Sequence, residues 1–390
     1  MRILNIGHLF HDGDGGDAAA IRTNFIMKGL EEYGCTVKTL SYANDGRCIH
    51  YVENTDGRFK YLNKNNFNNK IFCNLFKLFI QPIILFFYII KRRKETDIIF
   101  FDRIPVYLAI PLAVSKVFTS VKYVWGVNEF PIDFINGKRL LTVRAFSERL
   151  CFFILGIVSD LIIVISNDHK DCYQKIASKN TRLLVVPILM NTDHVYRHTE
   201  IQGLKEKTIA YGGALSSSNG VDFLLDVAKK LNLIRTDFKM TIFGPSISKE
   251  YTQAIANKID EFELNPYVTV LQAMPNDEAI KYMHSCDVLV IPKIADKRSI
   301  GYIPSKLGDY LFSEKVVVVT NVGDVPNYIN DGVNGFLVEP GDVDSFADKL
   351  SWILENYDSL HHVGKEGKKT AYLFDYKVQA SKIFKELHVI

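Results

Sequence analysis

The chain has 390 residues, a hydrophobic content of 47% and a net charge of only +3. This length exceeds one ordinary core and suits two domains, and the small net charge gives no argument for nucleic acid binding. The six cysteines form no close pair and no metal-like spacing, so we expect free thiols in a reducing, cytoplasmic compartment. The opening "MRILNIGHLF" is predicted to be a strand and not a signal peptide, because its apolar run is short.

Short, β-branched apolar runs recur along the chain. In the first half they are "RILNIG", "TVKTLSY", "DIIFF", "KYVWGV", "LIIVIS" and "LLVVPI", and in the second half "TIAYGG", "KMTIFG", "VTVLQ", "VLVIP", "VVVVT" and "GFLVE". Continuous apolar runs are typical of strands covered on both faces, and helical patterns separate many of them. Two sets of six such strands predict two doubly wound domains built from right-handed parallel units.

We expect an amino-terminal domain over residues 1–190, a polar linker over 191–207, a second domain over 208–370, and a terminal helical segment over 371–390 that can pack on either domain. The fold class is therefore α/β, with two doubly wound, Rossmann-like parallel-sheet domains facing a central cleft. Ligands of such sheets bind at the carboxyl ends of the strands, so the loops that follow strands are the candidate sites.

The loop "GHLFHDGDGGDAAAIRTNF" follows the first strand. Gly15 and Gly16 remove side chains before a helix, so the backbone there can approach a phosphate or a sugar. The loop lacks the spacing of the dinucleotide fingerprint. A plain glycine-rich turn remains the alternative.

The segment over residues 71–90, "IFCNLFKLFIQPIILFFYII", is followed by "KRRK". Its length matches a membrane span, but Lys77, Gln81 and Pro82 interrupt it. We favour a helix lying in the membrane interface, with Lys91 to Lys94 on lipid phosphates. A core crossover helix and a true span stay open. A second apolar, partly basic helix over residues 144–160 can extend the same surface.

The strand "KYVWGV" ends in Asn128 and Glu129. Polar groups at this point suit the acceptor side of a site, and a structural role is an equal alternative because strand ends commonly carry polar residues.

The stretch "IAYGGALSSSNGVDFLLDVAKKL" opens the second domain. Gly213 ends a strand, Asn219 lies in a polar loop, and Gly220 starts a helix. We expect this turn to present backbone amides to an anion.

The stretch "SIGYIPSKLGDYLF" lies between two buried strands. Pro304 suits the first position of a helix, which would place Ser305 and Asp309 on one face. Lys306 can meet a phosphate as a point charge, and Asp309 can accept two vicinal hydroxyl groups. A solvated helix with a Lys306–Asp309 ion pair is the alternative. The preceding loop adds three further basic side chains: Lys293, Lys297 and Arg298.

These stretches together resemble a known family. Strand, "PSKLGDYL", strand and then "NVGDVPNYINDGVNGFLVEPGD" look like the carboxyl domain of retaining glycosyltransferases of family four, which have the GT-B fold, over about residues 205–355. The amino half is similar more loosely, in "GGDAAAIRTNFIMKGLEEYGCTV" and "IVISNDHKDCYQK". The resemblance implies transfer of a sugar, with retention of the anomeric configuration, from a nucleotide diphosphate sugar (a UDP-sugar being expected) to a hydroxyl group.

Carried over by position, the family's second acid, which holds the nucleotide ribose, falls on Asp309 in a Pro-Ser-Lys-Leu variant of the signature. The first acid, which contacts the donor sugar, falls on Gly301, and we expect the amides of Tyr302 and Ile303 to be free instead. Asn219 stands where the family usually has a lysine that grips the diphosphate.

The resemblance thus implies a set of site residues. The expected donor-binding residues are Gly15, Gly16, Gly213, Asn219, Lys293, Arg298, Gly301, Tyr302, Ile303, Ser305, Asp309 and, near the base, Met274. Lys306 and Glu129 are the expected catalytic residues. We expect no metal ligand and no cofactor.

The apolar, basic face at residues 71–94 suggests an acceptor at the inner membrane surface, which is a membrane-associated glycan or a lipid-linked sugar used for cell-surface polysaccharide. We therefore expect the enzyme to be peripheral on the inner face of the membrane, bound through residues 71–94. The alternatives are a catalytically silent, membrane-associated GT-B subunit and a nucleotide-sugar epimerase or hydrolase on the same fold.

Overall fold

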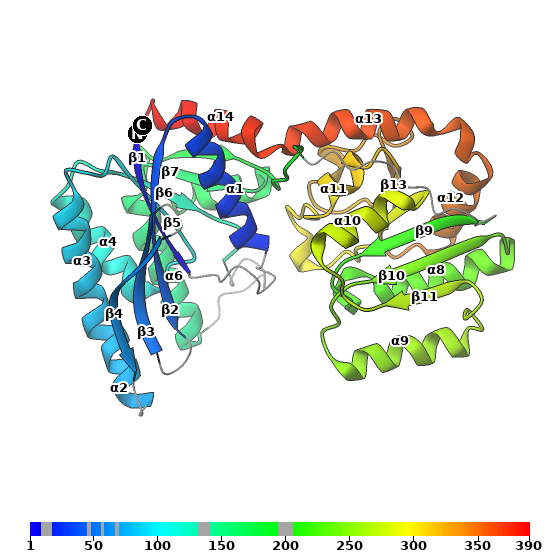
Figure 1. The fold of residues 1–390 in the computed structure, drawn as a ribbon, viewed down its shortest axis with the longest axis horizontal. Helices are drawn as coiled ribbons and strands as arrows, with labels where there is room; N and C mark the ends of the chain where they lie inside the picture. The colour runs from blue at the N-terminus through cyan, green and yellow to red at the C-terminus, as the bar shows by residue number, and fades with distance from the viewer. Residues whose placement is uncertain (9–17, 45–47, 56–57, 67–69, 132–140, 194–205) are drawn as a thin grey trace. The chain divides into compact units, whose positions relative to one another are not determined.

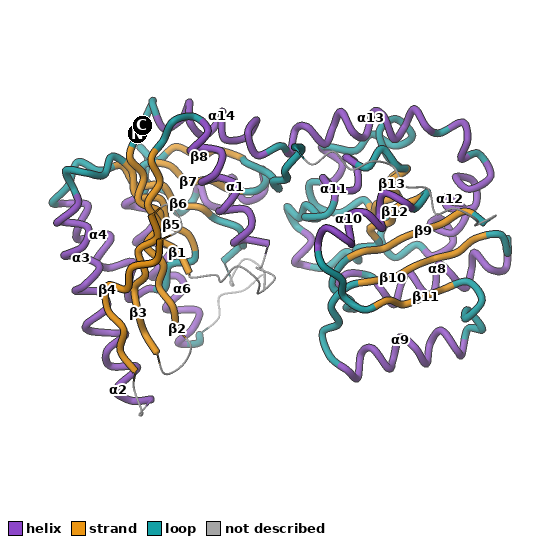
Figure 2. The backbone as a smooth tube through the Cα atoms, viewed as in Figure 1, coloured by secondary structure: helices purple, strands orange, loops and turns teal. Residues whose placement is uncertain are grey.

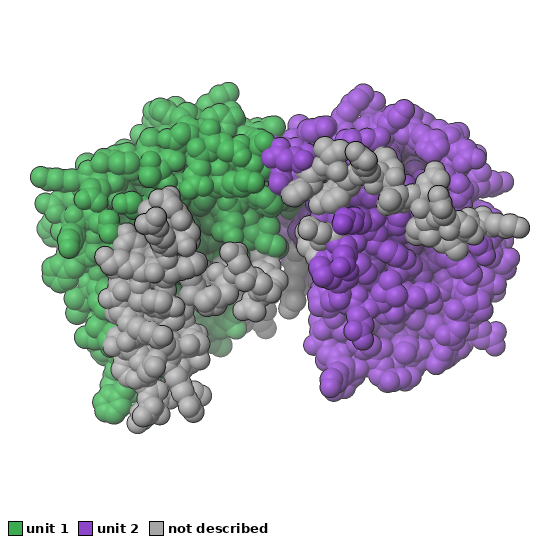
Figure 3. All heavy atoms as spheres, viewed as in Figure 1, with its two compact units in different colours: residues 1–189, 376–390 green, residues 190–375 purple. Residues whose placement is uncertain are grey.

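The computed structural model describes residues 1–8, 18–44, 48–55, 58–66, 70–131, 141–193 and 206–390 (Figure 1). The chain divides into two compact units (Figure 3). Unit 1 is Met1–Leu189 with Tyr376–Ile390, and unit 2 is Met190–Asp375. The first segment of unit 1 ends one residue before the expected boundary at 190. Unit 2 begins at Met190, ahead of the expected linker over 191–207, and ends at Asp375 instead of 370, and the terminal segment from Tyr376 belongs to unit 1.

Unit 1 contains an eight-stranded sheet in the order β4-β3-β2-β1-β5-β6-β7-β8. The six strands expected for the first half form its parallel part, from β2 to β8. β3 and β4 extend the sheet as antiparallel strands that the sequence analysis missed. The strands are β1 (Arg2–His8), β2 (Thr36–Asn44), β3 (Cys48–Thr55), β4 (Arg58–Asn66), β5 (Ile98–Asp102), β6 (Lys122–Gly126), β7 (Leu161–Val164) and β8 (Arg182–Val185).

Helices cover both faces of this sheet (Figure 1). They are α1 (Ala18–Glu32), α2 (Lys70–Leu75), the π-helix η1 (Phe76–Ile80), α3 (Gln81–Arg92), α4 (Val106–Val117), α6 (Val143–Val158), α7 (Asn167–Gln174) and α14 (Tyr376–Leu387). One core cluster joins α3, α4, α6 and α7 to the sheet, and another joins α1 and α14 to it. α14 crosses α1 so closely that a Cβ on Gly29 would lie 2.5 Å from the Cβ of Ala380.

Unit 2 contains a six-stranded, all-parallel sheet in the order β11-β10-β9-β12-β13-β14. Its strands are β9 (Lys207–Gly212), β10 (Phe238–Phe243), β11 (Val268–Leu271), β12 (Val288–Ile291), β13 (Val316–Thr320) and β14 (Phe336–Val338). Its helices include α8 (Val221–Ile234), α9 (Lys249–Glu261), α10 (Asn276–Ser285), α11 (Leu307–Phe312), α12 (Val343–Glu355) and α13 (His361–Ala371). All six strands expected for the second half are present, which confirms the doubly wound α/β prediction.

Each sheet has one point where the chain reverses its direction of travel across the strands (Figure 2). From β9 the chain moves outward through β10 to β11, then returns to β12 and moves the other way. The same reversal in unit 1 lies between β1 and β5. In doubly wound sheets the ligand crevice opens at the carboxyl ends of the strands at such a switch point, which singles out the loops after β9 and β12.

Candidate active site

The loop after β9 is held tightly at the switch point of unit 2. The amide of Gly212 donates to the phenolic oxygen of Tyr310 at 2.7 Å, and Tyr310 donates back to the carbonyl of Gly212 at 3.1 Å. The amide of Gly213 donates to the carbonyl of Phe243 at 2.9 Å. These contacts correct the expectation that the backbone amides of this turn face an anion, because the amides of Gly212 and Gly213 are already paired within the protein.

The end of the same loop touches the strand beside it. Gly220 has φ +80°, and a Cβ there would lie 1.7 Å from the carbonyl oxygen of Pro292. Only glycine fits such a contact, and α8 begins directly after it, as expected. The side-chain nitrogen of Asn219 donates to the carbonyl of Ala214 at 2.9 Å. This hydrogen bond joins the two ends of the loop, and it uses the side-chain nitrogen that the sequence analysis had expected at a donor ligand.

Lys293 is the buried cation at the switch point. It follows β12, is only 6% exposed, and its Nζ donates to the carbonyl of Ser218 in the loop after β9 at 2.6 Å. Its Nζ also lies 5.3 Å from the ring centroid of Tyr302. Lys293 thus joins the two loops that form the crevice and brings a positive charge to it.

Asp309 lies on α11, in the connection from β12 to β13. Its side chain is half-buried, and its carboxylate makes no hydrogen bond or ion pair with any residue that the structure describes. Burial raises the pKa of Asp309 above its usual value, and the charge of Lys306 opposes that shift. The expected alternative, a Lys306–Asp309 ion pair, is wrong, since neither side chain has a partner in the described chain. Two opposite charges are therefore available to a ligand.

The neighbouring residue fixes this helix in place. Tyr310 is fully buried and bonds both backbone groups of Gly212. Because α11 is only six residues long, this contact with β9 is what sets the position of Asp309 relative to the glycine loop. Sequence analysis missed Tyr310, although a tyrosine within a buried apolar helix requires a partner for its hydroxyl group.

The segment before α11 differs from the expected helix start. α11 begins at Leu307, and the carbonyl of Pro304 accepts a hydrogen bond from the Leu307 amide in a turn. Pro304 is therefore not the first helical residue, and Ser305 is an exposed turn residue that shares no helical face with Asp309. The expected helix start at Pro304, with Ser305 and Asp309 on one face, is corrected accordingly.

Gly301 adopts a left-handed conformation with φ +60°. The amide of Tyr302 donates to the carbonyl of Ser299 at 3.1 Å, which corrects the expectation that it is free. The amide of Ile303 donates to no residue that the structure describes. Burial raises the pKa of Tyr302 to about 12, so its phenol is a neutral donor at physiological pH.

Some of the other expected site residues are not described. Met274 follows β11, at the same carboxyl edge of the parallel sheet as the loop after β9, with β10 between the two strands. Gly15, Gly16 and the side chain of Arg298 lie outside the part of the chain that the structure describes. Glu129 lies in unit 1 with an exposed side chain, and its carbonyl accepts a hydrogen bond from Tyr173 at 2.8 Å.

The matching edge of unit 1 holds a buried polar cluster that sequence analysis missed. Arg22, 6% exposed, donates to the side-chain oxygen of Asn128 at 2.9 Å and to the carbonyl of Val186 at 2.7 Å. Asp102, 1% exposed, accepts a hydrogen bond from Thr23 at 2.9 Å. The signal was an aspartate directly after an apolar strand and an arginine within an apolar helix. The cluster ties α1 to the ends of the strands.

Two further groups lie at this edge. His169 accepts or donates a 2.7 Å hydrogen bond with the Ser166 hydroxyl, and its ring stacks on Phe130 at 3.7 Å between centroids. Burial, with help from the charge of Arg22, lowers the pKa of His169 to about 3, so the ring is neutral. The side-chain nitrogen of Asn128 is buried without a partner among the described residues.

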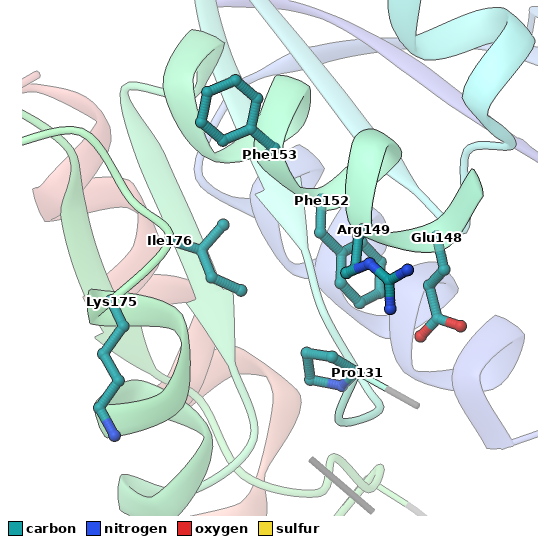
Figure 4. Close-up of a pocket in the computed structure, with 7 residues that line it drawn as sticks. All are labelled: Pro131, Glu148, Arg149, Phe152, Phe153, Lys175 and Ile176. Atoms are coloured by element: carbon teal, nitrogen blue, oxygen red, sulfur yellow. The ribbon is translucent and has the colours of Figure 1, made fainter. Parts of the chain in front are cut away.

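A pocket of about 340 Å³ opens on the flank of unit 1 between α6 and α7 (Figure 4). Its walls are apolar, from Pro131, Phe152, Phe153 and Ile176, and charged side chains lie at its border: Glu148, Arg149 and Lys175. None of the expected site residues lines it. In the described chain, no group of three or more histidine, cysteine, aspartate or glutamate side chains is placed to hold a metal ion.

The chain is similar to known glycosyltransferases. Residues 197–370, which include the switch point of unit 2, match the family model "Glycosyl transferases group 1". An uncharacterized glycosyltransferase of Methanocaldococcus jannaschii is 25% identical over 256 residues, covering 65% of this chain and 67% of that protein. The capsular polysaccharide biosynthesis glycosyltransferase CapM of Staphylococcus aureus is 23% identical over 260 residues, covering 60% of this chain and 63% of CapM.

Solved structures resemble the whole chain. The Anabaena protein Alr3699/HepE, crystallised in complex with UDP, superposes with a TM-score of 0.70 at 15% identity and covers 100% of both chains. A glycosyltransferase from Rickettsia africae superposes with a TM-score of 0.70 at 16% identity, covering 99% of this chain and 97% of the other. The fold is therefore the α/β GT-B fold, as the sequence predicted.

Proposed function

We propose that this protein is a retaining glycosyltransferase that moves a sugar from a nucleotide diphosphate sugar, with UDP as the favoured carrier, to a hydroxyl group. The observation that carries the proposal is Asp309. Its half-buried carboxylate has no partner in the described chain and follows β12, one of the two strands at the switch point. A carboxylate in this place can accept hydrogen bonds from both hydroxyl groups of a ribose.

The charge balance around Asp309 suits a diphosphate. Breaking the bond between the sugar and the nucleotide builds negative charge on the leaving diphosphate, and cations already in place stabilise that charge. Lys293 is held at the switch point by its bond to Ser218, and Lys306 is a half-exposed ammonium without a partner among the described residues. In the proposed reaction these two lysines supply the positive charge that Asn219 does not. Metal independence remains part of the proposal.

The acceptor is proposed to be a hydroxyl of a membrane-associated glycan or lipid-linked sugar in cell-surface polysaccharide synthesis, used at the inner face of the membrane. The similarity to CapM, which is named for capsular polysaccharide biosynthesis, supports this choice. Glu129 remains the proposed acceptor-side residue, because its exposed side chain follows the carboxyl end of β6.

A thermal-shift panel tests the donor half of the proposal. UDP, GDP, ADP, CMP and NAD are each added to wild type, to Asp309→Ala and to a control, Asp348→Ala, which removes an exposed carboxylate on α12. We expect UDP to raise the melting temperature of wild type and of the control by a few degrees, since a ligand at 100 times its Kd adds about 2.7 kcal/mol. An equal shift in Asp309→Ala, or no shift with any nucleotide in wild type, would contradict the proposal.

One observation favours the catalytically silent subunit as a second candidate. Gly301, where the family has its sugar-contacting acid, has φ +60°, so a glutamate there would be strained. Incubation with UDP-sugars and a panel of glycan acceptors separates the two candidates. Transfer with a retained anomeric configuration, read by NMR, supports the transferase. UDP binding without turnover supports the silent subunit, and donor turnover without acceptor indicates an epimerase or hydrolase.

A further inference from the structure

The outer surface of one helix layer in unit 1 is apolar. α3 packs against α4, and α4 packs against α6, so the three helices form a continuous layer on one face of the sheet (Figure 1). Each helix buries one stripe of side chains in the core, for example Leu85 on α3, Leu108 on α4 and Leu155 on α6. The opposite side of a surface helix is normally polar.

The helix of residues 71–92 breaks that rule. Phe72, Phe79, Ile83 and Phe87 are all more than half exposed, and their spacing of four and seven residues places them on one side of the helix. Only 22% of the most apolar 18-residue stretch of this helix is buried. The inner side of the helix therefore belongs to the core, and the outer side carries large apolar groups that the described chain leaves uncovered.

α4 and α6 continue this surface. On α4 the exposed apolar residues are Ile110 and Val114, and on α6 they are Phe146, Leu150, Phe153 and Ile157. Their spacings of three and four residues again form one outward stripe per helix. We call the exposed apolar side chains of α2, η1, α3, α4 and α6 the outer apolar face. By contrast, α9 of unit 2 exposes mainly small or polar residues such as Thr252, Gln253 and Asn257.

Positive charge accompanies the outer apolar face. Between Lys70 and Lys94 the chain has six basic residues and no acidic one, against a net charge of +3 for all 390 residues. Lys91, Arg93 and Lys94 are exposed. At the other end of the layer, Phe153 belongs both to the face and to the pocket of Figure 4, whose border carries Arg149 and Lys175 beside one carboxylate, Glu148.

We propose that the outer apolar face docks unit 1 into the boundary between headgroups and acyl chains of an anionic lipid membrane. Apolar rings on the outward side of helices and flanking cations are what such a boundary binds. The helix of residues 71–92 lies in the surface and does not cross it, because Leu85 and Ile89 are fixed in the same core as α4. A crossing helix would have to leave that core. The proposal is independent of the proposed enzymatic reaction.

Flotation with preformed vesicles tests the apolar part. Vesicles of phosphatidylcholine with phosphatidylglycerol are mixed with wild type, with Ile83→Ser/Phe87→Ser, and with Leu233→Ser/Ile234→Ser, which removes two exposed apolar residues from the end of α8 in unit 2. We expect the first variant to bind at least tenfold more weakly, since each buried large apolar side chain contributes substantially to partitioning, and the second to bind like wild type. Circular dichroism spectra and thermal melting of both variants serve as the folding control.

Neutralising charge tests the anionic part. The variant Lys91→Gln/Arg93→Gln/Lys94→Gln is compared with Lys365→Gln/Lys382→Gln/Lys385→Gln, three exposed lysines with no ion pair in the described chain. We expect the first triple variant to lose about a hundredfold in affinity for anionic vesicles at low salt, and to match wild type on neutral vesicles. Equal losses in the two triple variants would overturn the proposal.

Three further outcomes would also overturn it. One is wild type that fails to float with anionic vesicles. Another is a stable dimer in light scattering that Ile83→Ser/Phe87→Ser dissociates while vesicle binding is unchanged, which would assign the face to a second copy of the chain. The third is retention of the protein in cell membranes after alkaline carbonate extraction, which would indicate a spanning helix. Release by carbonate is the expected result.

Discussion

The carboxyl edges of the two sheets use polar side chains in opposite ways. At the edge of unit 1, Arg22 and Asp102 are almost fully buried and bonded within the protein. At the edge of unit 2, Asp309 and Lys306 have no partner in the described chain, although Asp309 is half-buried. Leaving a charge partly desolvated and unpaired costs stability. We therefore propose that the second edge is organised for a ligand, whereas the first holds α1 on the sheet.

The largest effect is expected where the two loops of unit 2 touch. Gly220→Ala would place a methyl group against the carbonyl of Pro292 at φ +80°, and Gly34→Ala in unit 1 has nearly the same φ with nothing within 4 Å. We expect Gly34→Ala to cost about 1 kcal/mol of unfolding free energy, from strain alone, and Gly220→Ala to cost about 3 kcal/mol or more. Urea unfolding of protein labelled with fluorotryptophan, followed by ¹⁹F NMR, measures the unfolding free energy of each unit. The two tryptophans, Trp125 and Trp352, lie one in each unit. Equal costs would show that the contact with Pro292 is not rigid.

The same substitution at the two edges should have opposite effects on stability. Asp102→Asn weakens the bonds to Thr23 and Arg103 and is expected to destabilise unit 1 by about 2 kcal/mol. Asp309→Asn removes a charge that pairs with nothing in the described chain, so unit 2 should keep or gain stability while its affinity for UDP falls by roughly 2 kcal/mol, or about 30-fold. Urea unfolding and calorimetric titration give the two readouts. Loss of stability in Asp309→Asn would mean that the carboxylate has a structural partner after all.

Tyr310→Phe should have a smaller effect on the stability of unit 2 than Gly220→Ala. It removes both hydrogen bonds to the backbone of Gly212, and we expect a loss of about 1–2 kcal/mol of unfolding free energy. UDP affinity should also weaken several-fold, because α11 is no longer fixed to the glycine loop. Tyr282→Phe, which removes a 2.9 Å bond to Thr241 in the same unit, is the control. It should lower stability without changing UDP affinity.

The smallest effect concerns pH. Because the pKa of Asp309 in the folded protein is raised above its usual value, protonation favours the folded state, and the cost of the buried charge appears as the pH rises through that raised pKa. Binding that needs the ionised carboxylate should therefore weaken, on acidification, at a higher pH than for an ordinary aspartate. The UDP phosphate titrates in every sample, so the readout is the ratio of UDP affinities of wild type and Asp309→Asn across pH. A constant ratio would contradict a role for the ionised carboxylate.

Much of the fold could be predicted from the sequence, because the buried parallel strands are continuously apolar and therefore recognisable one by one. β3 and β4 were missed because they are rich in polar residues such as Asn63 and Lys64. Their strand conformation depends on tertiary pairing, of β3 with β2 and of β4 with β3. Asp56 and Gly57, which separate them in the sequence, are the residue pair that favours a hairpin turn.

Only the parts of the proposed site that depend on a single residue could be predicted from the sequence. Asp309 was identified from the motif around it and from its place after a strand. The pairing of the amides of Gly213 and Tyr302, and the bond from Tyr310 to Gly212, depend on residues far apart in the sequence or on the local turn. A prediction made from a glycine-rich loop alone therefore overestimates the number of backbone amides that are free to bind a ligand.

Photo-cross-linking with 5-azido-UDP, followed by mass spectrometry of the peptides, tests directly whether unit 2 binds the nucleotide. We expect the label to fall in unit 2, on the loops that follow β9, β11 and β12. We also expect that excess UDP prevents the labelling and that Asp309→Ala abolishes it. Labelling confined to unit 1, or labelling of unit 2 that Asp309→Ala leaves unchanged, would contradict the claim that the second sheet carries the nucleotide site.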